Sequence, residues 1–435
     1  MKNARQVAFE ALLKMHQDKA YSNLTLDAVL SKANLDTRDR SFVSNLFYGV
    51  VERQITIDYQ LQRYLSQHLS KTKDEVLTIL RMGVYQILFM DRVPTRAAVN
   101  ESVNLTRANG VGFGAAVVNA VLRKVDQNGL VLPKGDDRST YMSVKYSCNN
   151  WLVRKLIREY GEEVTENFLE SSLKVPKICI RVNSTKVSQE KLMELLEKEG
   201  VIVTKTYLKN ALFIKLTNKS IDKLQCYRAG LFHVQDLSSQ LCVRAIEAKA
   251  GHTVIDLCSA PGGKTYTTAQ YMKNQGEVLA FDIHDHKIRL VENGAKRLGL
   301  TIIKGRVSDA SKINQIMPKA DRVLCDVPCS GFGIIGRKPE IKYKSEDCTE
   351  TLPRIQYEIL NAGATYVKDG GRLIYSTCTL NKDENEGVCE KFLEKHEDFV
   401  AISVLNEISA DKYKTLMPNK NDCDGFFVAC FEKRG

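Results

Sequence analysis

The sequence predicts a multidomain protein with an all-α bundle at the N-terminus, a small α/β domain in the middle and a doubly wound α/β domain at the C-terminus. Three observations support this prediction. Residues 1–130 show only the apolar periodicity of helices, residues 131–235 mix helical and strand patterns, and residues 236–435 alternate between strand-like and helix-like segments. At 435 residues the chain is also too long for one hydrophobic core, so two or three domains are expected.

The N-terminal part carries apolar residues at the spacing of amphipathic helices. Val7, Ala11, Leu12 and Met15 fall on one helical face. The same spacing recurs over residues 42–51, 76–88 and 115–122. Residues 1–134 carry 18 Lys and Arg against 12 Asp and Glu, a net charge of +6. We therefore expect residues 1–130 to form a helical bundle with a mildly basic balance.

The middle part, residues 131–235, overlaps a polar, turn-rich stretch at 126–145 that we interpret as a linker. The elements expected after it are helix, helix, strand, helix, strand and strand, at residues 151–160, 164–173, 178–182, 188–198, 201–206 and 211–216. The order strand, helix, strand, strand predicts a ferredoxin-like domain.

The C-terminal part, residues 236–435, alternates between short apolar runs and amphipathic stretches. Strands are expected at residues 253–257, 277–281, 300–303, 320–325, 371–375 and 424–431. Helices are expected at residues 264–272, 285–298, 352–368 and 383–394. This alternation predicts a largely parallel sheet with helices on both faces, a Rossmann-like arrangement.

The overall charge favours a polyanionic partner. The chain has 63 Lys and Arg against 52 Asp and Glu, a formal net charge of +11, and a pI near 8.9. Nucleic acid is the partner that such a balance suggests, although an excess of lysine also serves solubility.

The spacing of the cysteines and the hydropathy pattern indicate in which cellular compartment the protein is expected. None of the 12 cysteines forms a pair with C-x2-C spacing, so no metal site is expected. The chain starts with a polar stretch rather than an apolar signal segment, and no apolar run approaches the ~20 residues that span a bilayer. We therefore expect a cytoplasmic protein with reduced thiols and no membrane contact.

A glycine-rich turn follows the strand expected at 253–257. It consists of Cys258, Ser259, Ala260, Pro261, Gly262, Gly263 and Lys264. The P-loop of ATPases requires a glycine where Cys258 stands, and the dinucleotide motif Gly-x-Gly-x-x-Gly is absent. What remains is a strand, a tight turn and a helix whose N-terminus faces a ligand, which favours a nucleoside-containing cofactor.

Three aspartates follow strands of the same predicted sheet. Asp282 ends the second strand, where an acid can accept both ribose hydroxyls of a nucleoside. Asp309 lies beyond the third strand and Asp326 ends the fourth. One aspartate at a strand end is commonplace, but three in step with a glycine turn predict a nucleoside site.

Two cysteines also follow strands. Cys329 stands in the run Asp-Val-Pro-Cys-Ser and Cys378 in the run Ser-Thr-Cys-Thr. Each cysteine alone is more often a packing residue. Next to a cofactor turn and strand-end acids, the pair indicates nucleophilic catalysis by a thiolate.

Together these motifs resemble the RNA cytosine-5 methyltransferases that depend on S-adenosylmethionine. The resemblance implies that residues 258–264, Asp282, Asp309 and Asp326 bind S-adenosylmethionine. It also implies that Cys378 adds to carbon 6 of cytosine, that Cys329 assists product release and that Asp326 positions the base. In DNA cytosine methyltransferases the cysteine after the proline attacks instead, and spacing does not decide between these assignments. The presence of both cysteines favours the RNA class.

The expected RNA contacts come from the same resemblance. The N-terminal bundle resembles NusB-type RNA-binding domains, particularly around Arg38 and Arg40, although these two residues would equally suit a helix cap. The glycine-rich, basic loop between the two cysteine motifs resembles the family's substrate loop and offers Arg337, Lys338 and Lys342 to phosphate.

The substrate that the resemblance implies is small-subunit (16S) ribosomal RNA, methylated by a monomer. Two alternatives stay open: the same chemistry on transfer RNA or large-subunit ribosomal RNA, and a ribosome-assembly factor that binds RNA without catalysis. The second alternative is disfavoured because the residues expected to bind the cofactor and to catalyse are all present: Asp282, Asp326, Cys329 and Cys378.

Overall fold

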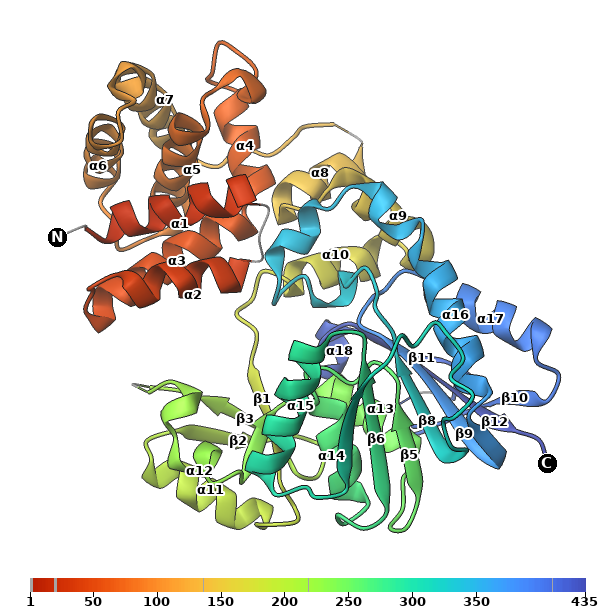
Figure 1. Cartoon of the computed structure of the whole chain (residues 1–435). Coiled ribbons are helices and arrows are strands. Elements are labelled where there is room, and N and C mark those ends of the chain that lie inside the picture. Colours follow the sequence, from red (N-terminus) through yellow and green to blue (C-terminus); the bar gives the residue numbers. More distant parts are fainter. Residues whose placement is uncertain (1–2, 19–21, 136, 218, 409) are drawn as a thin grey trace. The chain divides into compact units, whose positions relative to one another are not determined.

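The computed structural model describes residues 3–18, 22–135, 137–217, 219–408 and 410–435. The chain divides into two compact units, whose elements Figure 1 labels. Unit 1 comprises Met1–Lys174 and Ile335–Glu346, and unit 2 comprises Val175–Ile334 and Asp347–Gly435. This division assigns residues 131–174, which the sequence analysis grouped with the middle domain, to unit 1.

Unit 1 is helical, as the periodicity predicted. Its helices are α1 (Ala4–Asp18), α2 (Ser22–Lys32), α3 (Thr37–Glu52), α4 (Gln54–Gln62), α5 (Asp74–Phe89), α6 (Thr95–Ala108), α7 (Ala115–Asn128), α8 (Arg138–Tyr146), α9 (Asn150–Tyr160) and α10 (Glu162–Ser171). The core of the N-terminal bundle collects the apolar faces of α1, α3 and α5, including Leu46, Phe47 and Leu80. Among the described residues, no helix is both long enough and apolar enough to cross a membrane.

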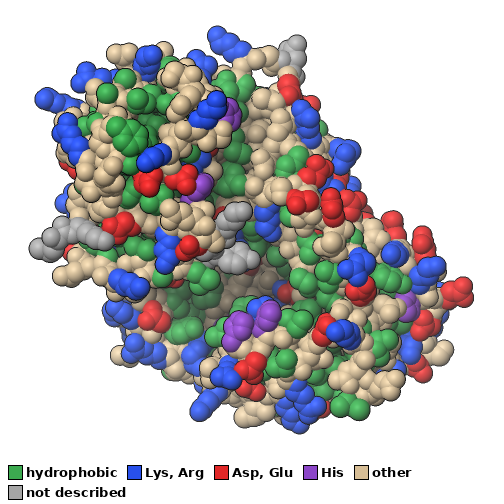
Figure 2. Space-filling model, turned by 45° about the horizontal axis from the view of Figure 1, so that its top comes forward, with side chains coloured by type: hydrophobic (Ala, Val, Ile, Leu, Met, Phe, Trp, Pro, Cys, Tyr) green, Lys and Arg blue, Asp and Glu red, His purple; other side chains and the backbone are tan. Residues whose placement is uncertain are grey.

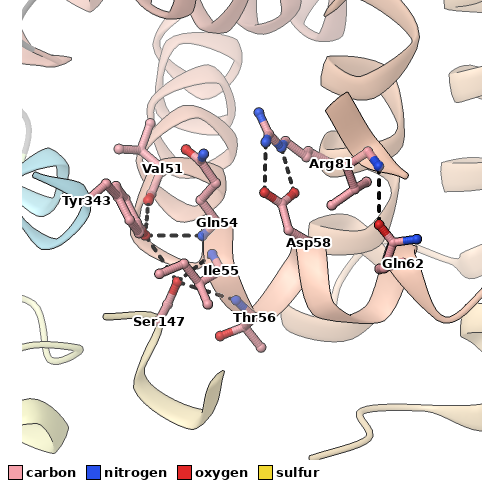
Figure 3. Close-up of polar contacts among 10 residues, drawn as sticks. Val51, Gln54, Ile55, Thr56, Asp58, Gln62, Arg81, Ser147 and Tyr343 are labelled. Carbon is pink, nitrogen blue, oxygen red and sulfur yellow. Dashed lines mark hydrogen bonds and ion pairs between the residues drawn. The ribbon is translucent and has the colours of Figure 1, made fainter. Parts of the chain in front are cut away.

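A short segment from between the two cysteine motifs completes unit 1. Figure 3 shows Tyr343, at the end of the 3-10 turn Pro339–Tyr343, donating its hydroxyl to the carbonyl oxygen of Val51 at 2.6 Å and accepting from the Gln54 amide at 3.2 Å. The Ser147 hydroxyl lies 3.1 Å from the same oxygen. The neighbouring Lys342 is fully buried. The segment 335–346 therefore packs into the helical unit through Lys342 and Tyr343, while its residues 337, 338, 345 and 346 stay exposed.

Unit 2 contains a small antiparallel sheet, which agrees with the predicted ferredoxin-like domain. Its strands run in the order β2-β3-β1-β4 and are β1 (Ile178–Val182), β2 (Ile202–Lys205), β3 (Ala211–Lys215) and β4 (Phe232–Val234). The helices α11 (Gln189–Lys198) and α12 (Gln225–Arg228) accompany this sheet. Sequence analysis did not identify β4, which is only three residues long.

The large sheet of unit 2 is mostly parallel, as predicted. Its order is β10-β12-β9-β8-β5-β6-β7, with β11 paired to β12. The strands are β5 (Thr253–Asp256), β6 (Glu277–Asp282), β7 (Ile303–Val307), β8 (Ala320–Asp326), β9 (Val367–Thr377), β10 (Phe399–Ile402), β11 (Lys414–Leu416) and β12 (Phe426–Lys433). The strands from β7 to β9 pair in parallel, and β12 joins β9 antiparallel. The order reverses between β5 and β8, and a doubly wound sheet binds ligands at such a switch point.

Figure 1 shows helices on both faces of this sheet. Its strands bury apolar side chains on both sides, as a sheet covered by helices requires. On β5, Val254 packs in one apolar cluster with α14 (Gly263–Tyr271) and α15 (Asp285–Leu298). Its neighbour Ile255 packs in another cluster with α16 (Leu352–Ala364) and α17 (Glu386–Lys395). The remaining helices are α13 (Leu237–Ile246) and α18 (Pro418–Asn421).

Several expected elements have other bounds in the structure, among them β9, which begins at Val367 rather than at 371, and α17, which begins at Glu386 rather than at 383. The linker predicted at 126–145 is interrupted by α8, which begins where the Asp137 carboxylate accepts from the amides of Ser139 and Thr140. The strand predicted at 300–303 is β7 at Ile303–Val307. The helix predicted at 352–368 ends at Ala364, because β9 already begins at Val367.

Candidate active site

The glycine turn after β5 has a backbone that requires glycine at one position. Gly262 has φ +106°, and a Cβ there would lie 2.3 Å from the ring of Tyr266. The Gly262 amide donates to the carbonyl oxygen of Ser259 at 2.7 Å, and the Ser259 amide donates to that of Phe281 at 2.7 Å. These bonds fix the turn against the end of β6 and place the N-terminus of α14 beside it.

An open cavity of about 360 Å³, which we call the main cavity, lies at the carboxyl ends of β5, β6 and β8. Most of the residues predicted for the site meet here. Its lining includes Cys258, Ala260, Asp282, Asp309, Asp326, Cys329 and Cys378, together with apolar side chains such as Ile283 and Ile359. The structure therefore brings the cofactor turn, the three strand-end aspartates and both cysteines to one site.

Asp282 and Asp309 are held in place on one wall of the main cavity. Asp282 is 8% exposed and accepts from the amide of His284 at 3.0 Å. Asp309 accepts from the hydroxyl of Ser311 at 2.7 Å and from its amide at 3.1 Å. The Ser311 hydroxyl and the nearby Lys312 lower the pKa of Asp309, so this carboxylate stays ionised.

Asp326 joins the turn to the cysteine loops. One of its oxygens accepts from the Lys264 ammonium at 2.7 Å and the other from the Ser376 hydroxyl at 2.7 Å. Burial alone would lower the pKa of Lys264, yet the facing Asp326 carboxylate raises it above its ordinary value. Lys264 is therefore a fixed positive charge.

The two cysteines form a close pair. The Sγ atoms of Cys329 and Cys378 lie 3.3 Å apart, and both side chains are partly exposed. The hydrogen bond with Cys378, together with burial, raises the pKa of Cys329 well above its ordinary value. At this distance the Cys329 thiol can donate a hydrogen bond to Cys378.

A second, smaller cavity of about 180 Å³ lies on the other side of the turn. Ser259, Pro261, Gly263 and Lys264 line it, and Cys258, Ala260 and Asp326 line both cavities. Its floor includes Asp256, which is 2% exposed and accepts from the Thr265 hydroxyl at 2.7 Å. Burial raises the pKa of Asp256 to about 7.

Sequence reasoning missed Asp256 and a second buried acid, Glu384. The position of Asp256 at the end of the strand before the glycine turn was a signal that could have identified it. Glu384 lies six residues after Cys378 and is fully buried. A glutamate in a polar run gives no sequence signal of burial, so only the structure identifies it.

The residues expected to contact RNA differ from one another in their exposure and hydrogen bonds. Arg38, Arg337 and Lys338 are exposed. Arg40 donates to the carbonyl oxygens of Leu35 at 3.2 Å and Ala33 at 3.1 Å, which favours a role in fixing the turn before α3.

Lys342 does not fit the prediction of a phosphate contact. It is fully buried in unit 1, and burial lowers its pKa to about 8. A side chain without exposed surface cannot meet a phosphate, so the prediction for Lys342 is wrong. On the face shown in Figure 2, Lys and Arg side chains are dispersed among Asp and Glu side chains rather than gathered in one patch.

Comparison with known proteins gives matches along the whole chain. The model of the family "16S rRNA methyltransferase RsmB/F" matches residues 243–432, the NusB family matches 2–127, and the ferredoxin-like domain of RsmF/B-like methyltransferases matches 148–219. The chain is 36% identical to "Probable ribosomal RNA small subunit methyltransferase B" of Bacillus subtilis, covering 100% of this chain and 99% of the relative. It is 31% identical to "Ribosomal RNA small subunit methyltransferase B" of Proteus mirabilis, with 99% of each covered. The crystal structure of PH0851 is similar with a TM-score of 0.83 at 27% identity, covering 98% of each chain.

The fold and the matched models define a methyltransferase with a Rossmann-like catalytic domain, a ferredoxin-like domain and a NusB-type helical domain. Within that class, the chain belongs to the family of 16S rRNA methyltransferases RsmB/F: the family model matches its catalytic domain, and relatives named ribosomal RNA small subunit methyltransferase B are more than 30% identical over its full length.

Proposed function

We propose that this protein transfers a methyl group from S-adenosylmethionine to carbon 5 of a cytosine in small-subunit ribosomal RNA, through a transient bond between Cys378 and the base. The observation that carries the proposal is the pair of thiols 3.3 Å apart in a cavity that also contains Asp282, Asp309 and Asp326. Membership of the family supports ribosomal RNA as the substrate.

The main cavity suits S-adenosylmethionine, which when bound supplies an electrophilic methyl group. A volume of about 360 Å³ is within the range of small-molecule sites. Asp282, at the end of β6, can accept from ribose hydroxyls, and Asp309, kept ionised, can accept from an exocyclic amine. The apolar side chains of Ile283 and Ile359 can pack against a planar base. Gly262 allows the left-handed backbone of the turn that leads into α14.

Cytosine needs activation because its carbon 5 is a weak nucleophile. Addition of the Cys378 thiolate to carbon 6 gives carbon 5 enamine character, so that it can take up a methyl group. The positive charge of Lys264 interacts with Cys378 and favours a thiolate there. The carboxylate of Asp326, anchored by Lys264 and Ser376, is suited to hold the ring nitrogen and amine of the cytosine.

Release of the product requires that the bond between Cys378 and carbon 6 of the cytosine breaks. A base takes the proton of carbon 5, its electron pair forms the ring double bond, and the pair of the carbon–sulfur bond returns to Cys378. The thiol of Cys329 can donate a hydrogen bond to the departing sulfur, and its raised pKa keeps the proton available. This arrangement supports the assignment of attack to Cys378 and of product release to Cys329.

The test compares two substitutions in the full-length protein with 16S ribosomal RNA and S-adenosylmethionine. Cys378→Ser should abolish 5-methylcytosine formation without an adduct, because a serine hydroxyl is not ionised at neutral pH. Cys329→Ala should transfer the methyl group but release the RNA slowly. A protein–RNA adduct should then persist on a denaturing gel, and mass spectrometry should locate it at Cys378.

The reverse pattern, with an adduct from Cys378→Ser and none from Cys329→Ala, would assign attack to Cys329, as in DNA cytosine methyltransferases. Unmodified 16S RNA after incubation with active wild-type protein, with methylation of transfer RNA or large-subunit RNA instead, would reject the proposed substrate.

A further inference from the structure

Glu384 is a buried acid that connects the two cysteine loops. It is 0% exposed and stands just before α17. Its Oε2 accepts from the amide of Ser330, next to Cys329, at 2.9 Å. Its Oε1 accepts from the side-chain amide of Asn381, three residues after Cys378, at 2.9 Å. One carboxylate thus binds both loops.

Gln356 of α16 adds a second connection. Its Nε2 donates to Glu384 Oε2 at 2.9 Å and to the carbonyl oxygen of Pro328, just before Cys329, at 2.9 Å. The hydroxyls of Ser330 and Thr379 lie 2.7 Å apart and join the loops again. These residues are all at most 1% exposed except Pro328, so the network is shielded from solvent.

A buried carboxylate is costly unless hydrogen bonds or a cation compensate for its lost hydration. None of the three groups that donate to the Glu384 carboxylate is a cation. A glutamine at this position would turn an NH2 group toward one of these donors, whereas an ionised carboxylate can accept from all three. The Glu384 charge contributes to the raised pKa of Cys329, after the Cys378 hydrogen bond, burial and the charge of Cys378.

We propose that Glu384 is a positioning residue for the methyl transfer: its carboxylate holds the loops of Cys329 and Cys378 in register and keeps Cys329 as the thiol that donates to Cys378. This inference rests on the proposed roles of the two cysteines. It adds one point: the two thiols take different roles because the Glu384 charge lies next to the loop of Cys329. The Ser330 amide fixes that charge next to Cys329, and the Asn381 amide ties it to the loop of Cys378.

The principal test is Glu384→Gln in the full-length protein, with Glu394→Gln as the control, because Glu394 is an exposed glutamate of α17, the helix that follows Glu384. The first measurement needs no RNA: iodoacetamide labelling of Cys329 and Cys378 is followed by mass spectrometry as the pH is raised. Loss of the negative charge should let Cys329 react at lower pH than in the wild type and in Glu394→Gln. An unchanged pH profile of Cys329 would overturn the electrostatic part of the proposal.

The second measurement follows turnover and the protein–RNA adduct. Glu384→Gln should reduce kcat on the order of 100-fold, the scale expected when reacting groups are misplaced. The KM for S-adenosylmethionine should stay unchanged, because Glu384 does not line the main cavity. The adduct should increase as the pH rises, since Cys329 then loses the proton that it donates. Glu384→Asp, which keeps the charge, should restore the labelling profile but only part of the turnover.

If Glu384→Gln does not fold, Gln356→Leu replaces it, since this change removes the bonds to Pro328 and to Glu384 but keeps the carboxylate. It should lower kcat and raise the adduct while leaving the labelling profile of Cys329 close to that of the wild type. Wild-type kcat and adduct levels in either folded variant would overturn the inference. Absence of 5-methylcytosine with the wild-type protein would instead reject the proposed function, so the two failures are distinguishable.

Discussion

The raised pKa of Asp256 predicts an unusual dependence of stability on pH. Burial raises this pKa from 3.8 to about 7, so the folded protein holds the proton more tightly than the unfolded chain. Ionisation of Asp256 therefore opposes folding. Its effect is absent below about pH 4, grows as the pH rises from about 4 to about 7, and is constant above that. A shift of about three units corresponds to about 4 kcal/mol at 1.36 kcal/mol per unit.

The substitution Asp256→Asn removes this titration and keeps the shape of the side chain. The amide oxygen can still accept from the Thr265 hydroxyl, and the amide nitrogen replaces Oδ1, which is buried without a hydrogen-bond partner. Relative to the wild type, the variant should gain about 3 to 4 kcal/mol in the free energy of unfolding between pH 4 and pH 8. For unit 2, with roughly 250 residues, this gain corresponds to a rise in Tm of about 6 to 8 °C.

The assay is thermal or urea unfolding of the wild type, Asp256→Asn and Asp369→Asn at a series of pH values. Asp369 is an exposed aspartate of the same unit, and its substitution serves as the surface control. A difference between Asp256→Asn and the wild type that does not change with pH would refute the reasoning, because it would mean that Asp256 titrates alike in the folded and unfolded chain.

Three further predictions concern ligands and the glycine turn. Asp282→Ala should weaken S-adenosylmethionine binding by about 1.5 to 3 kcal/mol in calorimetric titration, through loss of charge-assisted hydrogen bonds, and unchanged affinity would remove Asp282 from the site. Gly262→Ala should destabilise the turn and abolish cofactor binding because its Cβ would lie 2.3 Å from the Tyr266 ring, whereas Gly263→Ala, whose Cβ meets nothing closer than 3.6 Å, should leave Tm near that of the wild type. Replacing the exposed Arg337 and Lys338 together by alanine should reduce the slope of log affinity against log salt for RNA by roughly 1.4 to 1.8, and an unchanged slope would exclude phosphate contacts there.

Helices and strands whose beginning, apolar pattern and end are all visible in the local sequence could be predicted. The helix α15 has the predicted bounds because Asp285 opens it with an acidic first turn and Gly299, at φ +72°, ends it. The strand β7 was predicted three residues too early, since Leu300 and Ile302 looked like the apolar part of a strand. The structure buries Leu300 in the cluster of α14 and α15. β7 itself lies at the end of the sheet order, where an edge strand tolerates polar residues.

The residues of the candidate site also fall into a group that the sequence predicts and a group that it does not. Turn residues and strand-end acids were predictable because the topology of a doubly wound sheet brings strand ends together. The burial of Lys342 was not predictable, because a basic residue in a glycine-rich loop reads as exposed. Its burial depends on which helices the loop meets, and no local pattern encodes that contact. Glu384 was missed for the same reason.

The segment 335–346 has a consequence for the modularity of the protein. The chain passes between the units at residues 174–175, 334–335 and 346–347, so no single cut separates them. A truncation that removes the helical domain would leave Tyr343 and Lys342 without the partners that bury them. A working catalytic fragment would therefore need the segment shortened or replaced as well. Exchange of the helical domain between relatives would succeed only if this twelve-residue segment travelled with it.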